Sequence, residues 1–198
     1  MTAPPRTLNG GELAAWALRE ADVDVVFALH GGHLDSFLTG CRTFGIALVD
    51  CRHEAAAVNA ADGYARVTGR LGVAAVTAGP GLFNAVAGIS NAAADSVGIV
   101  IVTSSPPLGE SETGEMQGGL DQLGVVTPIT RWRQRAYAAH RVPDLVGLAV
   151  LDGHRPEDVA HLHHVGRRLL PVPGHVGHHQ GQLAVVEPER VVPVSPDG

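Results

Sequence analysis

Four short apolar runs recur along the first half of the chain, and a segment with helical spacing separates each run from the next. The runs are rich in β-branched residues and lie at residues 23–29, 46–50, 71–77 and 97–105. The run at residues 23–29 is short and nearly continuously apolar, which is typical of a strand that is buried on both faces. Before and between them, the spacing predicts helices at about residues 9–21, 35–43, 54–68 and 80–94.

This alternation of strand, turn and helix predicts the fold class. Units of this length place consecutive strands parallel, with the helices packed on both faces of the sheet. A weaker strand at about residues 130–137 and a helix at about residues 142–150 complete the periodic part. We therefore predict a doubly wound, mostly parallel α/β domain over residues 1–150.

Residues 151–198 have a different character. They contain seven of the 11 histidines and six of the 13 prolines, and their apolar residues follow neither the helical nor the strand period for more than a few positions. The composition predicts an atypical, poorly ordered tail. His175 and His179 have a spacing that suits a metal site on a helix, but Pro173 and Gly174 argue against a helix there. We predict no physiological metal site.

Charge and hydropathy exclude several classes of partner. The formal net charge is -6, and all 14 basic residues are arginines that are scattered along the chain. This pattern does not favour nucleic acid or an anionic membrane surface. The apolar runs are far shorter than the roughly 20 residues that span a bilayer, so a cytoplasmic protein is expected. Cys41 and Cys51 lack the spacing of a zinc site and are interpreted as small apolar residues.

The string TAGPGLFN, residues 77–84, follows a predicted strand and opens a predicted helix. That context suits a phosphate-binding loop. However, Asn84 stands where the dinucleotide fingerprint needs its third glycine, and a chain without lysine cannot form a Walker motif. The pattern therefore disfavours a nucleotide-binding module. Gly79 and Gly81 instead favour close approach of the backbone to another surface or to a flat ligand.

Glu54 begins the alanine-rich helix predicted at residues 54–68. An acid in the first turn is stabilised by the helix dipole, by about 0.3–1 kcal/mol, which is sufficient reason for its presence. It also shares a helical face with Val58 and Ala61, which should pack inward. Because the helix follows the carboxyl end of a strand, Glu54 lies where open α/β sheets bind ligands. Spacing alone leaves both interpretations open.

The string RHEAAAVNAADGYARVTGRLGVAAVTAGPGLFNAVAGISNA, residues 52–92, resembles the pyrimidine-binding domain of thiamine diphosphate enzymes of the acetolactate synthase group. The group shows an acid-led helix, then A-D-G-Y-A-R, a strand, and T-x-G-P-G followed by Asn. FALHGGHLDSFL before the string and MQGGLDQLGVVTPITRW after it are most similar to the benzaldehyde lyases. The resemblance covers residues 8 to about 150.

This resemblance implies a cofactor, thiamine diphosphate, that is bound across a dimer. One pyrimidine domain supplies a glutamate to the aminopyrimidine ring, and the diphosphate domain of the partner binds the diphosphate through Mg²⁺. Glu54 matches that glutamate, which would hydrogen-bond and protonate a ring nitrogen and so activate the thiazolium carbon. Thr77, Pro80 and Asn84 match the loop that lies against the ring.

The resemblance also implies residues that face a small carbonyl substrate. His30 and Gln117 match positions that would hydrogen-bond the substrate oxygen. From the residues alone, His30 could simply shape its turn and Gln117 could simply fasten its loop. A proline-glycine turn is common in acetolactate synthases at the position of His30-Gly31, which argues against pyruvate as the substrate.

The chain departs from the family pattern after residue 150. Family members continue with a middle domain and a G-D-G...N motif that holds Mg²⁺ and diphosphate, and the sequence contains neither. The tail has the composition of a GC-rich gene that is translated out of frame, which suggests a frameshift or truncation. We expect a domain of a lyase or carboligase that is inactive alone. The alternatives are one subunit of a split enzyme, such as a 2-keto acid decarboxylase, and a non-catalytic fragment.

Overall fold

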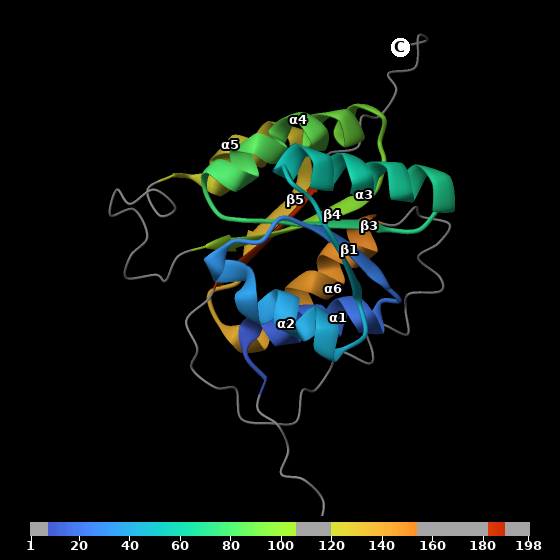
Figure 1. Ribbon diagram of the computed structural model, residues 1–198. Coiled ribbons are helices and arrows are strands. Elements are labelled where there is room, and N and C mark those ends of the chain that lie inside the picture. The colour runs from blue at the N-terminus through green and yellow to red at the C-terminus, as the bar shows by residue number, and fades with distance from the viewer. Residues whose placement is uncertain (1–7, 106–119, 154–181, 189–198) are drawn as a thin grey trace, which may run out of the picture.

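The computed structural model describes residues 8–105, 120–153 and 182–188. It is built around a six-stranded sheet with the strand order β2-β1-β3-β4-β6-β5 (Figure 1). Pairing is parallel from β2 to β4 and antiparallel on both sides of β6. The strands are β1 (Val25–Ala28), β2 (Ala47–Asp50), β3 (Gly72–Val76), β4 (Ile99–Ser105), β5 (Thr130–Arg135) and β6 (Gln182–Pro188). The predicted doubly wound α/β fold is confirmed.

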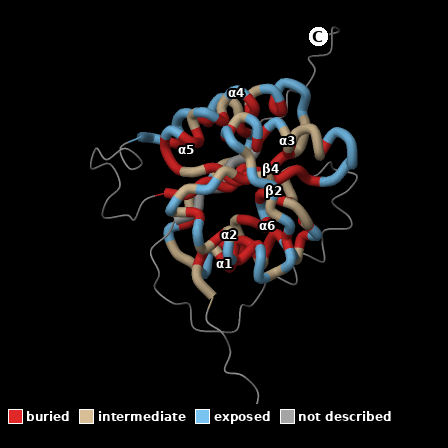
Figure 2. Tube along the Cα trace, in the orientation of Figure 1, coloured by how far each residue is buried: buried red, intermediate tan, exposed pale blue. Residues whose placement is uncertain are grey.

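Helices cover both faces of the sheet (Figure 1). One layer contains α1 (Gly10–Glu20), α2 (Asp35–Thr43) and α6 (Val142–Gly153). The opposite layer contains α3 (Glu54–Thr68), α4 (Pro80–Ala94) and α5 (Gln122–Val126). Each layer encloses its own apolar core against the sheet, because alternate residues of β3 point to opposite faces. Figure 2 shows the buried residues gathered on the strands and on the helix faces toward them.

Local sequence sets the helix ends. Asn9 caps α1 through a capping box with Glu12, in which each side chain accepts a hydrogen bond from the other residue's backbone. Gly69 ends α3 with a φ of 69°, a left-handed conformation that favours glycine. These ends agree with the helices that the sequence predicts.

The strand β6 was not predicted. It lies within residues 151–198, for which the sequence predicts an irregular tail, and it fills the position between β4 and β5. The run LAVVEP is too short to show a clear period, and only the two neighbouring strands supply its hydrogen-bonding partners. The domain boundary near residue 150 stays a prediction. The histidine-rich segment of residues 161–179 lies outside the described residues.

The two free cysteines differ in burial. Cys41 is buried, and burial raises the pKa of its thiol to about 12, so it serves as a small apolar residue. Cys51 is half-buried and donates a long hydrogen bond of 3.7 Å to the carbonyl oxygen of Val49. Among the described residues, no helix is both long enough and apolar enough to cross a bilayer.

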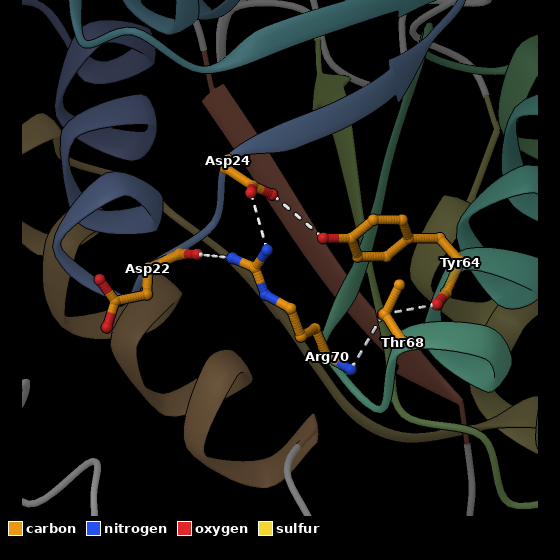
Figure 3. Close-up of polar contacts among 5 residues, drawn as sticks. All are labelled: Asp22, Asp24, Tyr64, Thr68 and Arg70. Atoms are coloured by element: carbon orange, nitrogen blue, oxygen red, sulfur yellow. Dashed lines mark hydrogen bonds and ion pairs between the residues drawn. The ribbon is translucent and has the colours of Figure 1, made fainter.

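A polar cluster joins the end of α3 to the start of β1 (Figure 3). Arg70 Nη1 donates to Asp24 Oδ2 over 2.7 Å, and Arg70 Nη2 donates to the carbonyl oxygen of Asp22 over 2.7 Å. The hydroxyl of Tyr64 donates to the other carboxylate oxygen of Asp24 over 3.1 Å. The cluster lies near the amino end of β1 and fastens the far end of α3, opposite Glu54.

This cluster predicts an acid-dependent contribution to stability. The hydrogen bond from Arg70 lowers the pKa of Asp24, against an opposing effect of desolvation, so Asp24 binds its proton less readily when folded than when unfolded. The stabilisation is therefore present above the unfolded pKa and is lost as the pH falls through the folded pKa. Arg70→Met should cost less than about 1 kcal/mol, because the pair is half-exposed. Urea unfolding across acidic pH should show a flatter pH dependence in Arg70→Met than in wild type.

Candidate functional site

The candidate residues gather at the carboxyl ends of the parallel strands. The chain runs from β1 outward to β2 through α2, and returns to β3 through α3 on the opposite face. Ligands of open α/β sheets bind in the crevice at such a reversal. His30 follows β1, Glu54 follows β2, and Thr77 follows β3. The topology thus brings to one edge three residues that are far apart in the sequence.

Glu54 is a buried carboxylate at the first position of α3. Only 7% of its surface is exposed, and it continues the buried face formed by Ala57, Val58 and Ala61. Asn84 Nδ2, from the second turn of α4, donates to Glu54 Oε2 over 3.0 Å. One carboxylate oxygen therefore has a fixed partner. Oε1, the other oxygen, faces the backbone of Gly81.

Two glycines surround the side chain of Thr77. A Cβ atom on Gly81 would lie 2.6 Å from Thr77 Cγ2 and 3.1 Å from Glu54 Oε1. A Cβ atom on Gly31 would overlap the hydroxyl oxygen of Thr77. That hydroxyl is buried and has no hydrogen-bond partner within the part of the chain that the structure describes. The glycines therefore pack closely on Thr77, and Gly81 leaves the buried carboxylate of Glu54 without a side chain beside Oε1, an arrangement that suits a flat polar ring.

The Thr77–Gly81 loop, which leads from β3 into α4, is held at three successive residues. Thr103 Oγ1 donates to the carbonyl oxygen of Thr77 over 3.4 Å. Ala78 N donates to Ser104 Oγ over 3.1 Å, and Gly79 N donates to Gln122 Oε1 over 2.9 Å. The partners come from β4 and α5 and are buried. The backbone of the loop is therefore fixed from the core side.

Gln122 and Ser104 carry no signal in the sequence that points to the site. Gln122 lies in the string MQGGLDQLGVVTPITRW, in which the family resemblance points to Gln117. A polar residue at the start of a short helix is usually exposed, and no spacing distinguishes one glutamine from the other. Ser104 lies between Thr103 and Ser105 at the end of β4, and this run of three hydroxyl residues gives no sign of which one contacts the loop.

The other predicted site residues have different surroundings. His30 is exposed, and its Nε2 lies 2.5 Å from Asp35 Oδ1, at the start of α2. Among the described residues, it shares no hydrogen bond with Glu54 or Asn84. Pro80 is exposed at the first position of α4. Gln117 lies outside the described residues. In residues 8–105 and 120–153, no group of three or more metal-ligating side chains occurs.

Comparison with known proteins identifies the family. Residues 8–125 match the family described as "Thiamine pyrophosphate enzyme, N-terminal TPP binding domain". The chain is 55% identical over 84 residues to 2-hydroxyacyl-CoA lyase 2 of Danio rerio, a match that covers 42% of this chain and 14% of that protein. It is 48% identical over 91 residues to a probable acetolactate synthase of Mycobacterium bovis, covering 46% of this chain and 17% of that protein.

The human 2-hydroxyacyl-CoA lyase 2 is 52% identical over 84 residues, which cover 42% of this chain and 13% of that protein. The matched stretch is therefore less than one fifth of each of these relatives. The finer similarity to benzaldehyde lyases stays a prediction. The family match covers more than half of the chain. The chain therefore belongs to the thiamine pyrophosphate enzymes as an N-terminal cofactor-binding domain, and its cofactor is thiamine diphosphate.

Proposed function

We propose that this chain supplies the pyrimidine-binding half of the cofactor site in a lyase or carboligase that acts on carbon–carbon bonds next to a carbonyl. The observation that carries the proposal is the buried Glu54 carboxylate, with Oε2 held by Asn84 and Oε1 left beside Gly81. A carboxylate with one fixed and one available oxygen is oriented to share a proton with a ring nitrogen.

The residues fit the aminopyrimidine ring of the cofactor. Gly81 carries no side chain beside Glu54 Oε1, so that oxygen can meet a ring nitrogen, and Gly31 lets the backbone after β1 pack closely on the side chain of Thr77. Thiamine diphosphate, when bound, supplies the carbon nucleophile that adds to a carbonyl and then stabilises the resulting charge. Glu54 holds or gives up a proton at Oε1, while Asn84 keeps the carboxylate from turning away.

The substrate side of the site is proposed with His30 and Gln117. Nε2 of His30 contacts the carboxylate of Asp35, so Nδ1 is the ring nitrogen that can meet a substrate oxygen. Gln117 would provide a second hydrogen bond. The chain pairs with a second copy in a homodimer or with a diphosphate-domain subunit, and Mg²⁺ and the diphosphate are bound by a partner that carries the G-D-G...N motif, which this sequence lacks. The substrate class is a small carbonyl compound.

Reconstitution tests this proposal. The purified chain is mixed with a diphosphate-binding domain from the acetolactate synthase group, thiamine diphosphate and Mg²⁺, and is assayed for benzoin cleavage and for turnover of 2-keto acids. Cleavage of benzoin supports the lyase. Release of carbon dioxide from 2-keto acids without ligation supports the split decarboxylase instead. Cofactor binding without any turnover supports the non-catalytic fragment.

Asn84→Asp should weaken cofactor binding in the reconstituted complex. The substitution replaces the amide donor with a second carboxylate beside Glu54 Oε2, and like charges in contact repel each other. We expect a loss of affinity of about tenfold, the factor that corresponds to one charged hydrogen bond. Titration calorimetry measures it. Asn91→Asp, an exposed position on the same helix, is the matched control and should leave the affinity unchanged.

A further inference from the structure

Gly79 adopts a backbone conformation that strongly favours glycine. Its φ is 65° and its ψ is −116°, and the residue is buried at the start of α4. Its carbonyl oxygen accepts the first hydrogen bond of α4, from Phe83 N over 3.1 Å. The conformation of Gly79 therefore determines the direction in which α4 leaves the sheet, and with it the position of Asn84 one turn later.

Gln122 satisfies the backbone amide of this residue. Its Oε1 accepts from Gly79 N over 2.9 Å, and its Nε2 donates to the carbonyl oxygen of Ser104 over 3.3 Å. The side chain is 1% exposed, so no water replaces either bond. A buried amide without an acceptor costs about 1–3 kcal/mol. One side chain thus joins the end of β4 to the turn that opens α4.

We propose that Gln122 is a positioning residue of the cofactor site. By holding Gly79 in its positive-φ conformation, it fixes the first turn of α4, and this turn carries Gly81 and leads to Asn84. Glu54 Oε1 lies beside Gly81 and Oε2 is bound by Asn84. Gln122 therefore sets the orientation of the carboxylate from the opposite side of the loop, without touching it. The effect on the cofactor rests on the proposed function, whereas the effect on the loop does not.

The chemistry of the Gln122 side chain separates this role from simple filling of the core. Methionine has a similar length, but its thioether sulfur is only a weak acceptor for Gly79 N and cannot donate to Ser104. Glutamate has the same shape and keeps Oε1, but it can donate to Ser104 only when it is protonated. Gln134→Met, at an exposed position of β5, makes the same chemical change away from the site.

Amide hydrogen exchange of the cofactor-free chain tests the effect on the loop. In Gln122→Met, the protection factor of Gly79 N should fall by about tenfold to a hundredfold relative to wild type. The Asn84 side-chain amide resonance should shift as its contact with Glu54 changes. Gln134→Met should change neither. Unchanged protection of Gly79 and an unshifted Asn84 resonance in Gln122→Met would overturn the proposal.

Gln122→Glu keeps the test decisive if the methionine variant does not fold. At low pH the protonated carboxyl can make both bonds and should preserve the protection of Gly79 relative to wild type. At neutral pH the ionised carboxylate and the carbonyl oxygen of Ser104 would be two acceptors in contact, and their repulsion should move the side chain and lower that protection. Equal protection factors at both pH values would also overturn the proposal. Thiamine diphosphate affinity in the reconstituted complex is measured separately. If Gly79 responds as expected but the wild-type complex binds no cofactor, the proposed function fails and the role of Gln122 in the loop stands.

Discussion

Glu54→Gln should lower the turnover of the reconstituted enzyme by about 10²–10⁴-fold, the usual contribution of a positioned acid or base. Glutamine retains the shape of the side chain and can still accept the hydrogen bond from Asn84. It cannot exchange a proton with a ring nitrogen. The affinity for thiamine diphosphate should therefore fall by about tenfold at most, the value of one hydrogen bond. Steady-state assays beside titration calorimetry separate the two effects.

The matched control is Glu20→Gln, the same substitution at the end of α1, in the opposite helix layer. It should change neither turnover nor affinity. Glu54→Asp keeps a carboxyl group that can exchange a proton but shortens the side chain, so it should retain more activity than Glu54→Gln. Full activity in Glu54→Gln would contradict the assignment of this residue.

Gly72→Ala should destabilise the chain by about 3 kcal/mol, the upper part of the range for an overfilled core. Gly72 begins β3, directly beneath α3, and an added Cβ would lie 2.8 Å from the backbone carbon of Ala61 and still closer to its oxygen. Backbone atoms cannot turn aside as a flexible side chain can. The helix that begins with Glu54 would have to move off the sheet. Denaturant unfolding, monitored by circular dichroism, measures the loss.

Gly63→Ala provides the contrast on the same helix. Nothing lies within 4 Å of a Cβ atom added at Gly63, so the substitution should stabilise α3 by up to about 1 kcal/mol through its helix propensity. A loss of stability in Gly72→Ala together with a gain in Gly63→Ala would show that the close packing of α3 on β3 determines the effect of an added methyl group. Equal stabilities would show that α3 does not pack on β3 as described.

The sequence predicts the framework of this fold because each element has its own local signal. The apolar runs of β3 and β4 are buried throughout, whereas β1 is partly buried and β2, at the edge of the sheet, is mostly exposed. The capping box at Asn9 and the glycine at position 69 mark helix ends. The strand β6 has no such signal, since its place depends on β4 and β5 rather than on its own residues.

The site was predictable only in part. Glu54 could be selected because a first-turn acid coincides with a buried helical face and with a motif of the family. Its hydrogen bond to Asn84 joins residues that are 30 positions apart, and the bond from Gly79 to Gln122 joins residues that are 43 positions apart. Neither pair follows a helical or strand period, so only the packing of α3, α4 and α5 on the sheet brings them together.

The most direct test of the central claim is cofactor binding by the chain together with a diphosphate-binding domain. Thiamine diphosphate is titrated, in the presence of Mg²⁺, into this chain alone, into the diphosphate domain alone and into the pair. We expect saturable binding by the pair that is tighter than binding by either component alone, and a smaller gain in affinity when the pair contains Glu54→Gln. Binding by the diphosphate domain alone that is as tight as binding by the pair, or no binding by the pair, would contradict it.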